Sequence, residues 1–244
     1  MDYDDLVLIA EVDELLSEPT VQSYADAVAL QFSDTESIVG QLESYSGELP
    51  IVITTHADGD NTPFSDSEID SLQTVVEYDP VEAIVIELDD AQKENRLIKN
   101  LNSANVDVII SNINHSQTPS KSDLMSIIME AAKYGDAVYI QTTAKTTNDT
   151  STLLSVINDA TEKDVIVGGI ATGEIGRHTR AIAPFYGSKL AFAPAAQSQS
   201  DNNRYTITIK ELFELIEDIE YSDTATSLHD SITNPLVSEY DNQN

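Results

Sequence analysis

Short apolar runs and longer segments with helical spacing alternate along the chain. The apolar runs are rich in β-branched residues and apolar on both faces, which is typical of parallel strands buried between two layers. They span residues 6–12, 27–32, 50–55, 83–88, 106–113, 137–142, 165–171 and 189–193. Apolar residues recur every three or four positions in the segments 65–78, 91–104, 120–134, 149–160 and 209–219. These segments predict amphipathic helices, most of them lying between consecutive strands.

The order of these elements predicts the fold. Eight strands with intervening helices fit a single (β/α)8 barrel of the TIM type, which typically needs about 250 residues, and the chain has 244. A doubly wound Rossmann sheet would place a glycine-rich turn after its first strand, but Val12-Asp13-Glu14-Leu15 contains no glycine. We therefore expect an α/β barrel over residues 1–220 and a polar tail over 221–244. The tail is interpreted as a mobile or surface-draped segment, with partner binding as the alternative.

Acidic residues dominate the charged positions. The chain has 43 Asp and Glu against 12 Lys and Arg, which gives a formal charge of −31. Such a field repels polyanions, so the charge argues against nucleic-acid binding through phosphate contacts and against attachment to anionic lipids. Salt at 1 M screens charges over about 3 Å and would remove the self-repulsion. The composition therefore favours a halophilic source.

Several classes of chemistry have no support in the sequence. The chain lacks cysteine, which excludes disulfides, thiolate metal sites and a cysteine nucleophile. No apolar run approaches the roughly 20 residues of a membrane span. The acidic start Met1-Asp2-Tyr3-Asp4-Asp5 differs from the basic start of a secretory signal, so we expect a cytoplasmic protein. Walker, zincin and nucleophile-elbow motifs are missing, and we expect no cofactor.

In a (β/α)8 barrel the reacting groups lie at the carboxyl ends of the strands. At these ends the sequence resembles the type I 3-dehydroquinate dehydratases, lyases of the shikimate pathway. Residues 111–120 (SNINHSQTPS) resemble the family segment S-x-H-D-F-x-x-T-P-S. Residues 173–188 resemble G-x-x-G-x-x-S-R followed by F-G-S, and residues 136–154 follow D-I-x-K-I-A and S-D-x-x-x-L-L without a gap. The likeness spans residues 3–219 and implies the same barrel.

The resemblance implies a Schiff-base dehydration of 3-dehydroquinate to 3-dehydroshikimate. In the family a strand-end lysine forms an imine with the substrate ketone, and a histidine moves the proton that lets water leave. Tyr139 occupies the position of that lysine, and Ile113 occupies the position of that histidine, with Asn114 in place of the following aspartate. A phenol cannot form an imine and isoleucine cannot titrate. The resemblance therefore implies a barrel in which both reacting groups are replaced.

The substrate-binding residues of the family are retained only in part. Ala29 and Gln31 replace a Glu-x-Arg pair, and His56 replaces the arginine after the third strand. Two family residues persist. The resemblance implies that Glu87 would support the catalytic histidine and that Arg180 would grip the substrate carboxylate as a bidentate clamp.

The family's Ser-Ala-Pro-Gly-Gln loop, near the C-terminal end of the barrel, corresponds to residues 200–204. The sequence does not fix the exact alignment of this loop. Ser200 and Arg204 are the candidate substrate contacts there, and Arg204 with Arg180 would form a two-arginine anion site. The alternative for Arg180 is a structural ion pair with one of the many carboxylates. Arg177 and His178 are interpreted as loop residues that cover the barrel end.

Other titratable residues are candidates to replace the lost catalytic groups or to bind a metal. His115, two positions after Ile113, could serve as a base, and Lys145 could form an imine; we favour plain loop residues in both cases, because neither position matches the family geometry. His56 and Glu87 could meet at the barrel mouth, but two ligands without a third make a poor metal site. The acidic loop holding Asp58, Asp60 and Asn61 is interpreted as a solvated loop rather than a Ca²⁺ site. No metal is therefore expected.

Two functional hypotheses remain open. The first keeps the family activity, with His115, Lys145 or another group taking over the chemistry. The second is a non-catalytic paralogue that binds an anionic metabolite or a partner through Arg180. Chemistry favours the second hypothesis. In both cases the expected ligand is a small anionic carboxylate such as 3-dehydroquinate, and the resemblance implies a homodimer.

Overall fold

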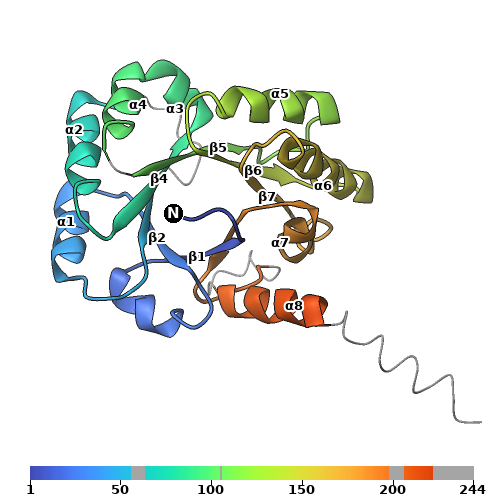
Figure 1. Ribbon diagram of the computed structural model, residues 1–244, viewed down its shortest axis with the longest axis horizontal. Coiled ribbons are helices and arrows are strands. Elements are labelled where there is room, and N and C mark those ends of the chain that lie inside the picture. The colour runs from blue at the N-terminus through green and yellow to red at the C-terminus, as the bar shows by residue number, and fades with distance from the viewer. Residues whose placement is uncertain (56–63, 105, 198–205, 222–244) are drawn as a thin grey trace, which may run out of the picture.

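The computed structural model describes residues 1–55, 64–104, 106–197 and 206–221. Eight parallel strands follow one another in the order β7-β6-β5-β4-β3-β2-β1-β8, and helices surround them (Figure 1). The strands are β1 Val7–Val12, β2 Ala27–Gln31, β3 Ile51–Thr54, β4 Val81–Glu87, β5 Asp107–Ile113, β6 Ala137–Thr143, β7 Val167–Thr172 and β8 Leu190–Pro194. Each of the predicted strands overlaps one of these, and the predicted (β/α)8 barrel is confirmed.

The ring of strands nearly closes between β7 and β8. The Lys189 backbone N–H, just before β8, donates to the Val167 carbonyl at 2.8 Å. Gly168 makes this approach possible, because a Cβ added there would lie 2.5 Å from the Leu190 carbonyl oxygen. A side chain at this position would push the two strands apart.

Helices cover the outside of the barrel. The structure has α1 Thr35–Ser44, α2 Asp66–Val75, α3 Leu88–Lys93, α4 Asn95–Leu101, α5 Lys121–Ala131, α6 Thr147–Thr161, α7 Thr179–Ile182 and α8 Ile209–Tyr221, with short 3-10 helices η1 Leu15–Thr20 and η2 Ala183–Tyr186. Polar side chains fix several helix starts. Ser120 accepts from the Asp123 N–H, and Ser65 forms a capping box with Glu68.

The helix expected over 91–104 is wrong as one continuous segment. It is divided into α3 and α4, because Glu94 leaves helical geometry at φ −104° and ψ 66°. Helix α1 was not expected from the sequence. It buries only Ile38 and Leu42, so its apolar stripe is too sparse to stand out from the polar residues around it.

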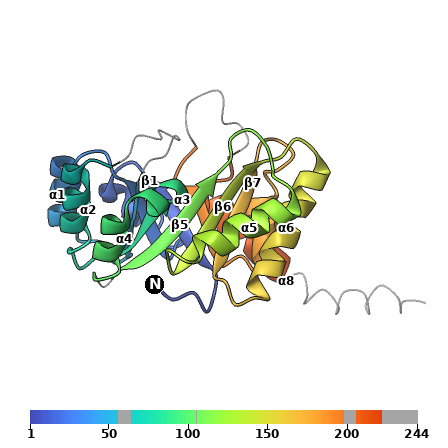
Figure 2. The same ribbon diagram turned by 90° about the horizontal axis from the view of Figure 1, so that it is seen from above.

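Two apolar layers hold the molecule together. The larger layer lies between the outer face of the strands and the helices, and the smaller one fills the barrel interior. The N-terminal segment crosses the barrel at the amino ends of the strands (Figure 1 and Figure 2). Met1 and Tyr3 pack there against the interior layer, and the Met1 amino group donates to the Asp107 carboxylate at 2.7 Å. This end of the barrel is therefore closed, and access to the interior is left to the carboxyl ends.

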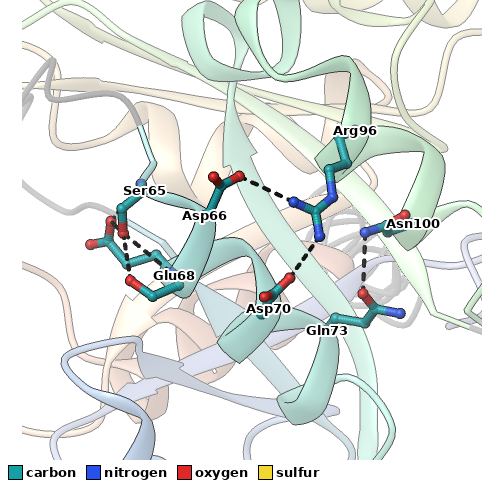
Figure 3. Close-up of polar contacts among 8 residues, drawn as sticks. Ser65, Asp66, Glu68, Asp70, Gln73, Arg96 and Asn100 are labelled. Atoms are coloured by element: carbon teal, nitrogen blue, oxygen red, sulfur yellow. Dashed lines mark hydrogen bonds and ion pairs between the residues drawn. The ribbon is translucent and has the colours of Figure 1, made fainter.

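On the outer surface an arginine joins two helices. Arg96 of α4 donates to Asp66 at 3.1 Å and to Asp70 at 2.8 Å, both on α2 (Figure 3). One turn further along α4, the Asn100 amide donates to Gln73 at 3.1 Å. Among the helices that the structure describes, none is long and apolar enough to cross a membrane.

Candidate binding site at the carboxyl ends of the strands

The carboxyl ends of the strands carry mostly polar side chains around the barrel mouth. In a strand every second residue faces the same side, so the position two residues after a buried interior residue faces the mouth. Glu11 follows Ile9 on β1 in this way, and Gln141 follows Tyr139 on β6. Two neighbouring cavities open here and share Glu11 and Pro194 as common walls. Their other mouth-facing strand residues are Gln31, Thr54, Gln141 and Thr172.

The smaller cavity holds Arg180, the arginine predicted as a carboxylate clamp. This cavity has a volume of about 400 Å³ and is also lined by Glu11, Gln141 and Thr172. Arg180 lies on α7 directly after β7, and its side chain is half-buried. One guanidinium nitrogen, Nη1, donates to the Ile207 carbonyl at 3.4 Å. No ion pair to Arg180 is found within the described residues, so its remaining N–H groups can face a ligand.

Glu11 is a mouth residue that the sequence reasoning missed. Its side chain lines the cavity and is the one exposed side chain of β1. Desolvation by the surrounding protein raises the pKa of the Glu11 carboxyl above its ordinary value, and the nearby Arg180 guanidinium partly opposes this rise. In the sequence Glu11 is one acidic residue inside an otherwise apolar strand segment. The apolar run alone predicts a strand buried on both faces, and it does not show that this one charge points into the barrel mouth.

Tyr139 fills the barrel interior one inward position below Gln141. Its side chain is only 6% exposed, and its ring packs edge-on against Phe192 with centroids 4.7 Å apart. The hydroxyl has no hydrogen-bond partner among the described residues. Burial raises the pKa of the Tyr139 phenol well above its ordinary value; Arg180 opposes this and Glu11 adds to it. The phenol therefore stays protonated at neutral pH and cannot act as a base there.

The other candidate residues near the fifth and sixth strands lie away from these cavities. Ile113 ends β5 with a half-buried side chain, while His115 and Lys145 are exposed on the loops that follow. Asn114 holds its own loop by accepting from the Ser116 N–H at 3.0 Å. Neither His115 nor Lys145 lines the two mouth cavities. The structure therefore does not bring these two candidate substitutes together with Arg180.

The loop after β7 is fixed by one buried hydroxyl. The Thr179 oxygen accepts from the Ala171 N–H at 2.8 Å and donates to the Gly176 carbonyl at 2.8 Å. Thr179 is fully buried and directly precedes Arg180. These contacts tie the glycine-rich loop to the end of β7. Arg177, expected only to cover the barrel end, also lines the smaller cavity.

The remaining candidates divide into two groups. Glu87 ends β4 with a half-buried side chain and directly precedes α3. The others lie outside the described residues: His56, Asp58, Asp60, Asn61, Ser200, Arg204 and most of the tail 221–244. Within the part of the chain that the structure describes, no three acidic or histidine side chains gather into a metal-binding group.

Comparisons with known proteins agree with this architecture. The family model described as Type I 3-dehydroquinase matches residues 8–222. The 3-dehydroquinate dehydratase of Haloarcula marismortui is 29% identical over 201 residues, covering 80% of this chain and 88% of that protein. The 3-dehydroquinate dehydratase of Halobacterium salinarum is 28% identical over 207 residues, covering 82% and 92%.

Solved structures show the same fold. The 3-dehydroquinate dehydratase from Geobacillus kaustophilus superimposes with a TM-score of 0.77 at 18% identity, covering 89% of this chain and 92% of that chain. The type I enzyme from Clostridium difficile gives a TM-score of 0.77 at 18% identity, covering 89% and 94%.

Proposed function

Because the chain belongs to the type I 3-dehydroquinase family, we propose that its barrel mouth binds a small carboxylate such as 3-dehydroquinate through Arg180, and that it does not dehydrate this ligand through an imine. The observation that carries the proposal is the contrast between two positions. Arg180 lines an open cavity of about 400 Å³. Tyr139, at the position of the family's imine-forming lysine, is a buried phenol.

The replaced groups support the loss of this chemistry. An imine requires a primary amine, and a phenol offers none. The carbanion-forming step also requires a proton acceptor within about 3 Å of the reacting carbon, and Ile113 has no titratable atom. His115 and Lys145 are exposed on loops outside both mouth cavities. The alternative, retained dehydration through one of these two residues, has no geometric support in the described residues.

Turnover and trapping test the catalytic half of the proposal. Purified protein in multimolar KCl is mixed with 3-dehydroquinate, and formation of the conjugated enone is followed by absorbance. Borohydride is then added and the protein mass is measured. We expect neither turnover nor a reduced adduct. An adduct on Lys145 would show that the imine chemistry has moved to that residue, and turnover without an adduct would show an elimination that needs no imine.

Calorimetric titration tests the binding half. Replacing Arg180 with Ala should weaken 3-dehydroquinate binding by about 1.5–3 kcal/mol, or roughly 10- to 150-fold, because a charge-assisted bidentate contact is lost. Arg96→Ala is the matched control, since Arg96 contacts only α2 carboxylates in the described structure. Equal affinities of the wild type and the Arg180→Ala variant would contradict the proposal.

A further inference from the structure

The cavity around Arg180 contains charges of both signs that do not pair with one another. Glu11 and Arg180 line the same space, yet they form no ion pair, and the Glu11 carboxylate accepts no hydrogen bond within the described residues. Glu11 is exposed toward the cavity and Arg180 is half-buried in its wall, so both charges can contact a ligand that enters it. Two charges of opposite sign therefore face one cavity without pairing.

A ligand that carries only a carboxylate would satisfy these groups incompletely. Its negative charge would pair with Arg180 but would enter the same cavity as the Glu11 carboxylate, and like charges close together repel each other. A ligand that carries an ammonium group as well would pair with both residues. The net charge of the cavity would then stay unchanged on binding. The volume of about 400 Å³ accommodates a small ring or a short chain.

We propose that the cavity selects zwitterionic amino-carboxylates, with the ligand carboxylate on Arg180, the ligand ammonium on Glu11, and Glu11 as the specificity-determining residue. The inference rests on the proposed carboxylate binding at Arg180 and adds the chemical class of the ligand.

Other charged groups around Glu11 do not supply the missing partner. Arg177 lines the cavity but its side chain is exposed, and its charge helps lower the pKa of Glu211 at the start of α8, after the Thr208 hydrogen bonds. Asp13 and Glu14 line the larger cavity on the other side of Glu11 and add negative charge. An incoming ammonium group is therefore attracted, and an additional anion is repelled.

Two matched probes test the inference by calorimetric titration: cyclohexanecarboxylate and 3-aminocyclohexanecarboxylate, which differ by one ammonium group at pH 7. For the wild type we expect the amino compound to bind at least about tenfold more tightly, or about 1.4 kcal/mol. In Glu11→Gln the two affinities should agree within about twofold. Glu43→Gln, which removes one exposed carboxylate of α1, should keep the wild-type preference. Far-ultraviolet circular dichroism confirms that each variant is folded.

The pH dependence provides a second readout. Since the pKa of Glu11 is raised, acidification should neutralise it before most carboxylates, so the preference for the amino compound should fall as pH falls and stay flat in Glu11→Gln. Equal binding of the two probes to the wild type, or an unchanged preference in Glu11→Gln, would overturn the inference and leave carboxylate binding at Arg180 intact. If neither probe nor 3-dehydroquinate binds, both proposals fail.

Discussion

The hydroxyl of Tyr139 is a polar atom buried among apolar neighbours. Leaving such a group unpaired costs about 1–3 kcal/mol, and the hydroxyl has no partner among the described residues. We therefore expect Tyr139→Phe to leave the free energy of unfolding unchanged or to raise it by about 1 kcal/mol, because the ring contact with Phe192 is kept.

Equilibrium unfolding in urea at constant high salt measures this change. Tyr134→Phe is the control, since the Tyr134 hydroxyl donates to Glu130 at 3.4 Å and is partly exposed. Removing that hydroxyl should not stabilise the protein. A clear loss of stability in Tyr139→Phe would mean that its hydroxyl makes a contact that favours the folded state.

The buried hydroxyl of Thr179 differs from that of Tyr139, because it makes two hydrogen bonds. Replacing it with Val keeps the shape but leaves the Ala171 N–H without its partner. We expect a loss of about 1–3 kcal/mol in stability, together with weaker binding of carboxylates, because the loop that carries Arg180 is no longer tied to β7. Thr179→Ser keeps the hydroxyl and should retain most of the affinity. If Thr179→Val binds carboxylates as the wild type does, the loop is held by other contacts.

Single residues differ in how far their sequence context reveals them. The family resemblance of the glycine-rich segment before it predicts Arg180 as a site residue, and the structure places Arg180 in a cavity. Glu11 was missed, because one charge within a buried strand looks like an interruption of the pattern until the direction of its side chain is known. Direction depends on strand register, which the structure fixes by pairing Ile9 with Ala27 and with Phe192.

At the level of elements, the strands were easier to predict than the helices. A parallel strand covered on both sides is apolar throughout. Its apolar run can therefore be recognised without knowing which residues face the barrel interior. Helix α1 exposes half of its residues and buries only two, and η1 and η2 are too short for any period to show. The break at Glu94 follows from local backbone geometry, which apolar spacing does not encode.

The contact between α2 and α4 allows a test of surface ion pairing. Arg96 bridges two aspartates, but its side chain is 55% exposed and the aspartates are more exposed still. We expect Arg96→Ala to cost less than about 1 kcal/mol at low salt and almost nothing in multimolar KCl, since exposed pairs are weak and screened. Thermal unfolding at two salt concentrations measures both values. A large cost that persists at high salt would indicate packing by the arginine stem instead.

At the level of the whole molecule, the excess of acidic residues governs stability. The formal charge is −31. In the folded chain the carboxylates lie closer together than in the unfolded chain and repel one another more strongly. We expect the midpoint of thermal unfolding to rise steeply as KCl increases from about 0.1 to 1 M, where the screening length falls from about 10 to 3 Å. Scanning calorimetry across this range tests the expectation. A midpoint that does not change with salt over this range would contradict it.

Side chains alternate in direction along each strand, and substitutions at the two kinds of position have different consequences. Residues that point outward pack against the helices and maintain the scaffold, whereas those at the inward carboxyl ends line the cavities of the barrel mouth. Substitutions at the rim therefore leave the packing between strands and helices intact. A lineage can exchange its rim residues one at a time and keep a folded protein at each step, so a reaction can be lost, or a new ligand acquired, while the barrel persists.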